Sequence, residues 1–308
     1  MKITSVADLQ AAYESLKNTV AIREGVHETI DGYRKHILIC GGTGCTSSGS
    51  TSLREKLEEE LAAHDLEKEV KVVTTGCFGL CALGPIMIVY PDGTFYSRVT
   101  PDDIPEIVET HLVGGTPVAR FEYHEKNGDH HVVNSLGEMT FYKKQHRVAL
   151  HNCGVIDPEN INDYVARRGY QALAKVLTSM SREDVVQTML DSGLRGRGGA
   201  GFPTGLKWKF AMGSTGKKYV CCNADEGDPG AFMDRSVLEG DPHAVLEAMA
   251  IAGYAIGSDE GYIYVRAEYP IAIHRLKIAI EQAHEAGLLG KNIFGTGFNF
   301  DISLRFGA

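Results

Sequence analysis

The sequence predicts an α/β protein with two domains in succession, and three observations support this prediction. Short apolar runs that suit buried strands alternate with amphipathic stretches of helical period, which favours a layered α/β architecture. The length of 308 residues suits two domains of about 150 residues each. Ten of the 35 glycines are concentrated in two short stretches, residues 41–49 and 193–205, and are not spread along a linker.

The composition excludes several classes of protein. The net charge of −9 argues against a nucleic-acid-binding protein, because phosphate contacts favour a basic surface. No apolar run is long enough for a membrane helix, and residues 1–20 lack the apolar core of an export signal. We therefore expect a soluble, cytoplasmic protein. Seven cysteines in such a chain indicate metal binding and not a disulfide framework.

The first half predicts a helical extension over residues 1–33 and a small α/β domain over 34–113. One helix carries Leu53, Leu57 and Leu61 on a single face, and the hydroxyl residues 50–52 are expected to cap its start. A second helix opens at Pro101. The strands of this domain are expected at residues 36–40, 70–73, 86–90 and 94–97.

The second half predicts a connector over residues 114–150, with a hairpin-type turn at 127–129, and a second α/β domain over 151–308. Strands and helices alternate in this domain, which favours a layered sheet. Its helices are expected at 160–168, 169–178, 181–192, 242–256 and 270–286, and its strands at 218–222 and 261–267.

Four cysteines of the first domain predict a metal centre. Cys40 and Cys45 are separated by four residues and Cys77 and Cys81 by three, and both pairs follow the ends of predicted strands. Neighbouring glycines permit the close backbone approach that a sulfide-containing cluster needs. An iron–sulfur cluster suits these spacings best, with structural zinc and a redox dithiol as alternatives. Burial without a functional role is expected of the remaining cysteines, Cys153, Cys221 and Cys222.

This region resembles the thioredoxin-like [2Fe–2S] ferredoxin family. Cys-x4-Cys is followed, after 31 intervening residues, by Cys-x3-Cys, with Leu83-Gly84-Pro85 just after it. The resemblance covers about residues 34–113. It implies a thioredoxin-like fold in which the four cysteines hold a [2Fe–2S] cluster at one end of the sheet.

The second glycine-rich stretch is not a Rossmann loop. Residues 196–201 satisfy G-x-G-x-x-G formally, but a predicted helix and not a strand precedes them. Phe202-Pro203 does not look like the first turn of a Rossmann helix, and no Gly-Lys-Ser/Thr follows as in a Walker loop.

Backbone N–H groups of this loop, together with fixed cations, predict an anion cradle. The cations are Arg195, Arg197 and Lys207, and the flat side chains beside them are Phe202, Trp208 and Phe210. Phosphate binding combined with aromatic stacking indicates a nucleotide or a flavin.

Polar side chains follow the strand predicted at 218–222, namely Asn223, Asp225, Glu226 and Asp228. The carboxyl end of a strand is where α/β domains place ligand-binding groups. The alternative is an acidic turn in which one aspartate caps the backbone.

Longer motifs in the second domain resemble the flavin subunit of respiratory complex I and its soluble relatives. They run from Gly193 to Trp208 and from Cys222 to Arg235, with Ala267-Glu-Tyr-Pro270 and Gly295-Thr-Gly297 beyond them. A ferredoxin-like domain ahead of this module resembles the flavin subunits of NAD(P)-linked, electron-bifurcating [FeFe]-hydrogenases. The resemblance implies an FMN-binding α/β domain of the complex I flavin-subunit type.

The resemblance also implies residue roles. FMN would be held by Gly196, Arg197, Gly198, Gly199, Lys207, Asn223, Asp225 and Glu226. The nicotinamide nucleotide would face Phe202, Lys207, Phe210 and Asp228, and Gly201 and Gly227 belong to the same cofactor-binding motifs. The family position of Asp228 is often glutamate, which leaves NADH and NADPH open. No catalytic acid or base is expected, since hydride transfer to a flavin requires none.

The implied function is hydride exchange between NAD(P)(H) and FMN, with single electrons passing through iron–sulfur clusters to or from a hydrogenase subunit. Electron bifurcation with ferredoxin belongs to this expectation. The implied partners are an [FeFe]-hydrogenase catalytic subunit, a small [2Fe–2S] thioredoxin-like subunit and ferredoxin. Two alternatives stay open: the flavin subunit of a formate dehydrogenase or NADH:quinone oxidoreductase, and a non-catalytic electron-transfer or docking module.

Members of that family continue beyond the position of Ala308 into a second flavin-contacting segment with a Cys-Gly-Glu-Glu motif. A cysteine-rich helical domain with a [4Fe–4S] cluster follows in them. We therefore expect the flavin domain to be incomplete here, and a [4Fe–4S] cluster only in such a C-terminal part.

Overall fold

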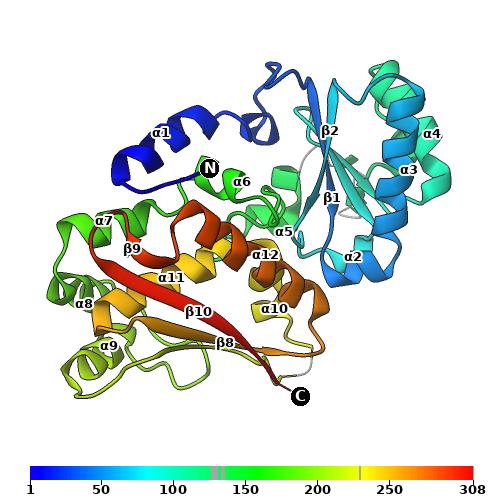
Figure 1. Ribbon diagram of the computed structural model, residues 1–308. Helices are drawn as coiled ribbons and strands as arrows, with labels where there is room; N and C mark the ends of the chain where they lie inside the picture. The colour runs from blue at the N-terminus through cyan, green and yellow to red at the C-terminus, as the bar shows by residue number, and fades with distance from the viewer. Residues whose placement is uncertain (126–130, 133–135, 229, 308) are drawn as a thin grey trace. The chain divides into compact units, whose positions relative to one another are not determined.

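The computed structural model describes residues 1–125, 131–132, 136–228 and 230–307 (Figure 1). Its contacts divide the chain into two compact units. The cysteine unit comprises Leu16–Ala166 and Glu239–Asp241, and the glycine-loop unit comprises Met1–Ser15, Arg167–Leu238 and Pro242–Ala308. The domain ranges given above, 1–33, 34–113, 114–150 and 151–308, stay predictions.

A mixed sheet forms the centre of the cysteine unit. In the described part of this unit its strand order is β2-β1-β3-β4, with β2 parallel to β1 and with β3 and β4 antiparallel to their neighbours. The strands are β1 (Lys35–Cys40), β2 (Val70–Thr75), β3 (Ile86–Tyr90) and β4 (Thr94–Ser97), which confirms the four predicted strands. Cys40 pairs with Thr75, so the chain leaves β1 and β2 at the same end of the sheet.

Helices and short turns complete this unit. The α-helices are α2 (Thr43–Ser47), α3 (Ser50–Ala63), α4 (Ile104–Ile107), α5 (Thr140–Lys143) and α6 (Ile161–Ala166). A π-helix, Val108–Val113, continues α4, and short 3-10 turns lie at Ala21–Glu24, Cys81–Leu83, Pro101–Asp103, Ala119–Phe121 and Leu136–Glu138. The pair β5 (His124–Glu125) and β6 (His131–Val132) is antiparallel. The turn predicted at 127–129 lies outside the described residues.

Helix α3 confirms the predicted amphipathic pattern but not its cap. Leu53, Leu57 and Leu61 are buried in the core beneath the sheet. The expected capping by hydroxyl residues is wrong, because the N-cap is Gly49 in the left-handed conformation, with a φ of 95° and no side-chain cap. The chain passes almost directly from α2 into α3, and a glycine can adopt the left-handed backbone at this junction without steric cost.

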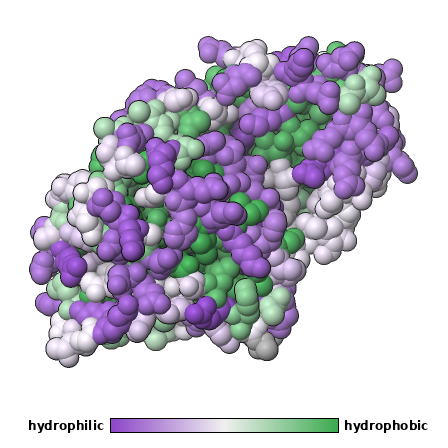
Figure 2. Space-filling model, viewed as in Figure 1, coloured by the Kyte–Doolittle hydropathy of each residue, from purple (hydrophilic) through white to green (hydrophobic). Residues whose placement is uncertain are grey.

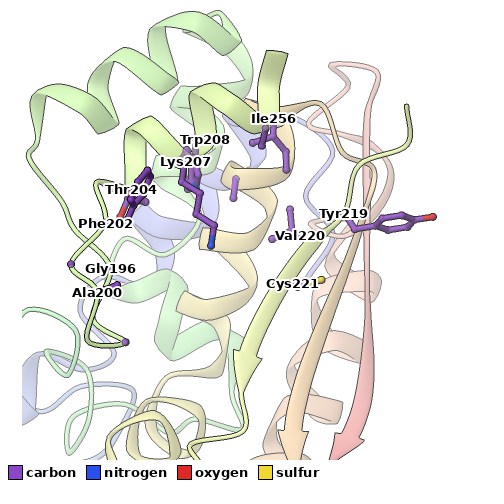
Figure 3. Close-up of a pocket in the computed structure, with 14 residues that line it drawn as sticks. Gly196, Ala200, Phe202, Thr204, Lys207, Trp208, Tyr219, Val220, Cys221 and Ile256 are labelled. Atoms are coloured by element: carbon purple, nitrogen blue, oxygen red, sulfur yellow. The ribbon is translucent and has the colours of Figure 1, made fainter. Parts of the chain in front are cut away.

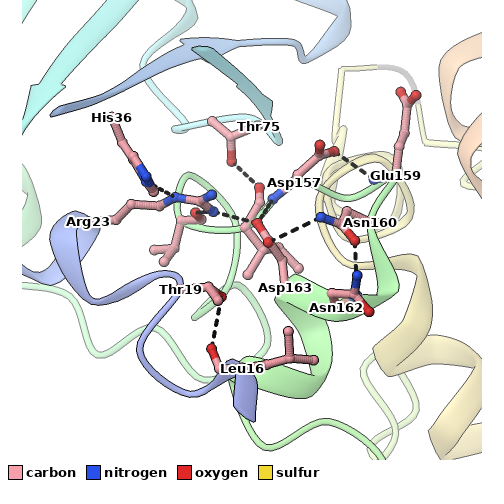
Figure 4. A network of polar contacts seen from close by, with 12 residues as sticks. Leu16, Thr19, Arg23, His36, Thr75, Asp157, Glu159, Asn160, Asn162 and Asp163 are labelled. Carbon is pink, nitrogen blue, oxygen red and sulfur yellow. Dashed lines mark hydrogen bonds and ion pairs between the residues drawn. The ribbon is translucent and has the colours of Figure 1, made fainter. Parts of the chain in front are cut away.

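A buried polar network links the start of the cysteine unit to its later segments (Figure 4). The Arg23 guanidinium forms an ion pair with Asp163 at 2.5 Å and donates to Nδ1 of His36 at 3.1 Å. The Arg23 and Asp163 side chains are 1% and 3% exposed. Burial, with the Arg23 and Lys71 charges nearby, lowers the pKa of His36 to about 3, so this imidazole is a neutral acceptor.

A second sheet forms the glycine-loop unit. In the described part of this unit its order is β7-β8-β10-β9, with β7, β8 and β10 parallel and β9 antiparallel to β10. The strands are β7 (Val220–Ala224), β8 (Glu260–Arg266), β9 (Gly290–Ile293) and β10 (Phe298–Gly307). Helix α11 (Pro242–Ile256) contacts β7, β8 and β10, and also packs on α12 (Pro270–Ala286).

Several elements of this unit confirm predictions made from the sequence, and several others were not predicted. Both α11 and α12 match their predicted bounds, and α8 (Arg182–Asp191) begins with the expected Ser181 capping box. Helices α1 (Val6–Leu16) and α7 (Gln171–Ser179) lie in their predicted regions. The elements absent from the prediction are α9 (Thr204–Gly213), α10 (Met233–Gly240), β9 and β10.

Helix α9 corrects the interpretation of the loop's surroundings. A helix does follow residues 193–203, with Pro203 at its N-cap, although the sequence there has no typical helix start. The Rossmann interpretation still fails, because the element before the loop is helix α8 and not a strand.

Among the described residues, no helix combines the length and the hydrophobicity that a membrane crossing requires. On the face seen in Figure 2, hydrophilic residues are interspersed with smaller hydrophobic patches.

Candidate functional site

The cysteine unit gathers the four predicted ligands near one end of its sheet. Cys40 ends β1 and Cys45 lies in α2, while Cys77 follows β2 and Cys81 begins a 3-10 turn. The Sγ atoms of Cys77 and Cys81 are 3.8 Å apart. Cys40 and Cys45 are buried, and Cys81 is exposed. The cysteine set therefore has a buried side and a solvent side.

Hydrogen bonds connect these thiols to one another and to the backbone. Cys40 is bonded to Cys45, which raises the pKa of Cys40 to about 12 and lowers that of Cys45. A bond to Cys40 raises the pKa of Cys77. Backbone N–H groups of Gly42, Ile86 and Gly79 donate to Cys40, Cys45 and Cys77, the last at 3.2 Å. Such N–H donors are what cluster sulfurs accept.

The geometry of these four residues fits a two-iron cluster. Among the described residues, no three His, Cys, Asp or Glu side chains converge as ligands of a single ion do. The thiols form a chain from Cys45 through Cys40 and Cys77 to Cys81. A [2Fe–2S] cluster takes four cysteines spread over two irons, which suits such a chain. The backbone is fitted to the sulfurs, since a β-carbon on Gly84 would lie 2.7 Å from Sγ of Cys45.

The other cysteines only partly follow expectation. Cys153 is fully buried, as predicted. Cys222 is half-buried, and burial raises the pKa of its thiol to about 11. The expected burial of Cys221 is wrong: it is exposed, because β7 is an edge strand and successive side chains alternate between faces.

The glycine loop of the other unit is closed at its base and open at its tip. The N–H of Gly196 donates to the carbonyl of Phe202 at 2.9 Å, and Thr204 donates to Leu194 at 2.9 Å. The Arg195 guanidinium donates to the carbonyl of Gly201 at 3.2 Å, so Arg195 braces the loop. A β-carbon added at Gly198 would meet no atom within 4 Å. Protein packing therefore does not explain the glycine at this tip position.

An apolar pocket of about 450 Å³ lies between the loop, α9 and β7. Figure 3 shows the Lys207 side chain reaching from α9 into the space between the glycine loop and β7. Of the predicted residues, Gly196, Gly198, Gly201, Phe202 and Lys207 line it. Trp208, Tyr219, Ala252 and Ile256 add flat and apolar surface. A flat ring with an anionic group matches this lining.

A second, acidic pocket of about 740 Å³ also borders the loop tip. It follows the carboxyl end of β7, as the sequence predicts. Of the predicted residues, Arg197, Gly198, Gly199, Asn223, Asp225, Glu226, Gly227 and Asp228 line it. Gly198 lines both pockets, so the two pockets meet at the loop tip.

Glu226 differs from its neighbours because its carboxylate is engaged by protein. It accepts hydrogen bonds from the N–H groups of Met233, Asp234 and Arg235 at the start of α10 and from the Tyr269 hydroxyl. Burial alone would raise the pKa of Glu226, but these bonds together lower it. The capping function considered for an aspartate is thus performed by this glutamate.

The structure brings together all but one of the predicted cofactor-binding residues. Phe210 lies on α9, is 62% exposed and lines neither pocket. The sequence analysis assigned no role to six further lining residues, of which the last three lie within the motif from Cys222 to Arg235: Tyr219, Ala252, Ile256, Ala231, Met233 and Asp234. The small apolar residues carry no chemical signal, and Met233 and Asp234 would have needed the start of α10 to be recognised.

Comparison with known families explains both sites. Residues 27–111 match the family of thioredoxin-like [2Fe–2S] ferredoxins, and residues 189–307 match the Nuo51 FMN-binding domain. The chain carries both domains. The ferredoxin domain contains the four cysteines, and the FMN-binding domain contains the glycine loop and the acids after β7. This confirms the predicted fold class and cofactors, a [2Fe–2S] cluster and FMN, and leaves the zinc and dithiol alternatives without support.

The relatives of these two domains are oxidoreductase subunits. The chain is 65% identical over 174 residues to NADP-reducing hydrogenase subunit HndC of Solidesulfovibrio fructosivorans, covering 56% of this chain and 35% of that protein. It is 49% identical over 162 residues to the F 2 subunit of the NADH-quinone oxidoreductase of Rhizobium meliloti, covering 52% and 38%. It is 34% identical over 281 residues to the alpha subunit of NAD-reducing hydrogenase HoxS of Cupriavidus necator, covering 88% and 44%. The chain thus spans less than half the length of these relatives.

Proposed function

We propose that this chain is part of the flavin subunit of an NAD(P)-linked hydrogenase, exchanging electrons between a nicotinamide nucleotide and iron–sulfur clusters. One observation carries the proposal: a four-cysteine sheet end and a two-pocket glycine loop occur on the same chain. The 65% identity to a hydrogenase subunit supports the hydrogenase link. Electron bifurcation, an [FeFe]-type catalytic partner, a small [2Fe–2S] subunit and ferredoxin belong to this proposal as its finer parts.

The bound flavin would accept or donate hydride at the nicotinamide and pass on electrons singly. The residues of this chain would bind the two cofactors and orient them. Lys207 and Arg197 supply cations, one in each pocket, for phosphate groups. Carboxylates of Asp225 and Asp228 accept hydrogen bonds from hydroxyl or ring N–H groups. Cys40, Cys45, Cys77 and Cys81 would hold the cluster that takes single electrons.

A second candidate is the flavin subunit of an NADH:quinone oxidoreductase. The 49% identity to the Rhizobium meliloti protein favours it. The partner distinguishes the two candidates: a co-purified complex that reduces NAD(P)⁺ with H₂ supports the hydrogenase assignment. A complex that oxidises NADH only with quinone supports the second candidate.

Gly198→Ala tests the flavin part of the proposal in the full chain. The added β-carbon meets no protein atom, so the folded protein tolerates it, but it occupies space at the wall of both pockets. We expect FMN affinity, measured by flavin fluorescence titration, to fall at least tenfold, and NAD(P)H:viologen reductase activity to fall with it.

Gly213→Ala is the matched control. Gly213 is exposed at the end of α9, and its β-carbon would also meet no atom within 4 Å. This variant should bind FMN as the unmodified chain does. Equal FMN affinity in the two variants would show that the loop tip does not contact the flavin. Iron and sulfide content should stay unchanged in both, because the cysteines lie in the other unit.

A further inference from the structure

Residues 239–241 form a polar and closely packed insert in the cysteine unit, although they follow the ferredoxin domain by more than a hundred residues. The Glu239 carboxylate accepts hydrogen bonds from the backbone N–H of Thr43, at 3.1 Å, and from the Thr43 hydroxyl. Thr43 lies between Cys40 and Cys45. Glu239 thus binds the segment between Cys40 and Cys45, which we call the first cysteine loop.

The same insert also packs against the segment that carries Cys77 and Cys81, which we call the second cysteine loop. A β-carbon on Gly76, directly before Cys77, would lie 2.4 Å from Cα of Gly240. The Asn152 amide donates to Asp241 at 2.8 Å on the far side. These contacts fix the backbone that carries Glu239, so its carboxylate has a defined place at Thr43, between Cys40 and Cys45 in the chain.

Glu239 is 1% exposed, and burying a carboxylate is costly unless hydrogen bonds compensate it. The two donors of Thr43 supply such bonds to an acceptor-only group. Packing alone would be served as well by a glutamine or an apolar residue. The charge of the carboxylate therefore needs a further explanation. Because protein screens an electric field less than water does, a buried charge acts strongly on a redox centre near it.

We propose that Glu239 is a positioning residue that holds the Cys40–Cys45 loop and sets the reduction potential of the cluster. This inference rests on the proposed ligation by the four cysteines. Reduction adds one negative charge to the cluster, and a nearby carboxylate disfavours that charge. Glu239 therefore lowers the midpoint potential of the cluster.

The test is potentiometric titration of the cluster in the full chain, followed by its visible and EPR spectra. Glu239→Gln keeps the shape but removes the charge: its Oε1 accepts from the Thr43 N–H, and its Nε2 donates to the Thr43 hydroxyl in place of the bond accepted there by the carboxylate. We expect its reduction equilibrium to shift about tenfold toward the reduced form, about +59 mV for one electron. Iron and sulfide content should be unchanged.

Glu69→Gln is the matched control. Glu69 also belongs to the cysteine unit and pairs with Arg34 at the surface. It precedes β2, whose far end at Thr75 lies near the cysteines, about 20 Å away along the strand. At physiological salt this exceeds the screening length of about 8 Å, so the potential should not change.

Glu239→Asp separates charge from contact. It keeps the carboxylate, so the reduction equilibrium constant of its cluster should stay within threefold of that of the unmodified chain. An unchanged potential in E239Q, or equal shifts in E239Q and E239D, overturns the inference. If E239Q assembles no cluster, E239D decides alone, and a tenfold shift there refutes the charge effect. A missing cluster in the unmodified chain would instead refute the proposed cysteine ligation.

Discussion

Replacing Asp163 with Asn tests whether the buried Arg23 network holds the cysteine unit together. Arg23 forms its ion pair with Asp163 and donates to the carbonyl of Val155 at 2.8 Å. Its Nη2 atom is buried without a hydrogen-bond partner among the described residues. His36, the third contact, is neutral and cannot balance the charge. Asp163→Asn therefore removes the carboxylate that forms the ion pair with this buried guanidinium.

The expected cost follows from the burial of both partners. Breaking a buried ion pair by removing one partner costs about 3–5 kcal/mol, against about 0–1 kcal/mol for a surface pair. For a unit of this size, that loss lowers the melting temperature by about 6–20 °C. Arg23→Met combined with Asp163→Asn removes both charges, and it should cost less than D163N alone.

Hydrogen exchange of the β1 amides measures the opening of the cysteine unit in the full chain. The fluorescence of Trp208, the single tryptophan, reports on the other unit and is the internal control. We expect D163N to lose β1 protection while the Trp208 transition stays in place. A loss below about 1 kcal/mol, or a double variant worse than D163N, would refute this reasoning.

Two further outcomes are expected. The pKa values of His36, about 3, and His243, about 4, lie below 6.5 because both rings are buried, so the unfolded chain binds more protons in acid. Stability should be fully present above pH 6.5 and fall by about 1.4 kcal/mol per pH unit per histidine below it, and a denaturant midpoint that is flat from pH 7 to 5 would contradict this. Tyr142→Phe removes the hydroxyl that donates to the carbonyl of Phe78 inside the second cysteine loop. At about 1 kcal/mol for the bond, chelator-driven bleaching of the cluster should accelerate about fivefold; an unchanged rate would show that this bond does not hold the loop.

The sequence predicted those features that have a local chemical signature. The cysteine spacing and the apolar runs at 36–40 and 86–90 led to the correct sheet and to its cysteine-bearing end. The glycine loop and the acids after β7 led to the two pockets. Each of these features depends on residues close together in the chain, where spacing and residue type determine geometry.

Long-range contacts could not be predicted in this way. Glu239 carries no functional signal in the sequence, and only the fold brings it to Thr43. Residues 114–150 looked like a connector, yet Tyr142 from this segment binds the second cysteine loop. The cap of α3 failed because a local hydroxyl pattern was overridden by a glycine that takes a left-handed backbone.

The position of Gly198 in the lining of both pockets has a thermodynamic consequence. When a ligand in one pocket orders the loop tip, its binding includes the loss of conformational entropy of that tip. A ligand that then binds in the other pocket loses less entropy, because the tip is already ordered. Because binding free energies are linked, each ligand must change the affinity of the other by the same factor. Two ligands that both contact the loop tip would therefore bind cooperatively through the ordering of that tip, in addition to any contact between them.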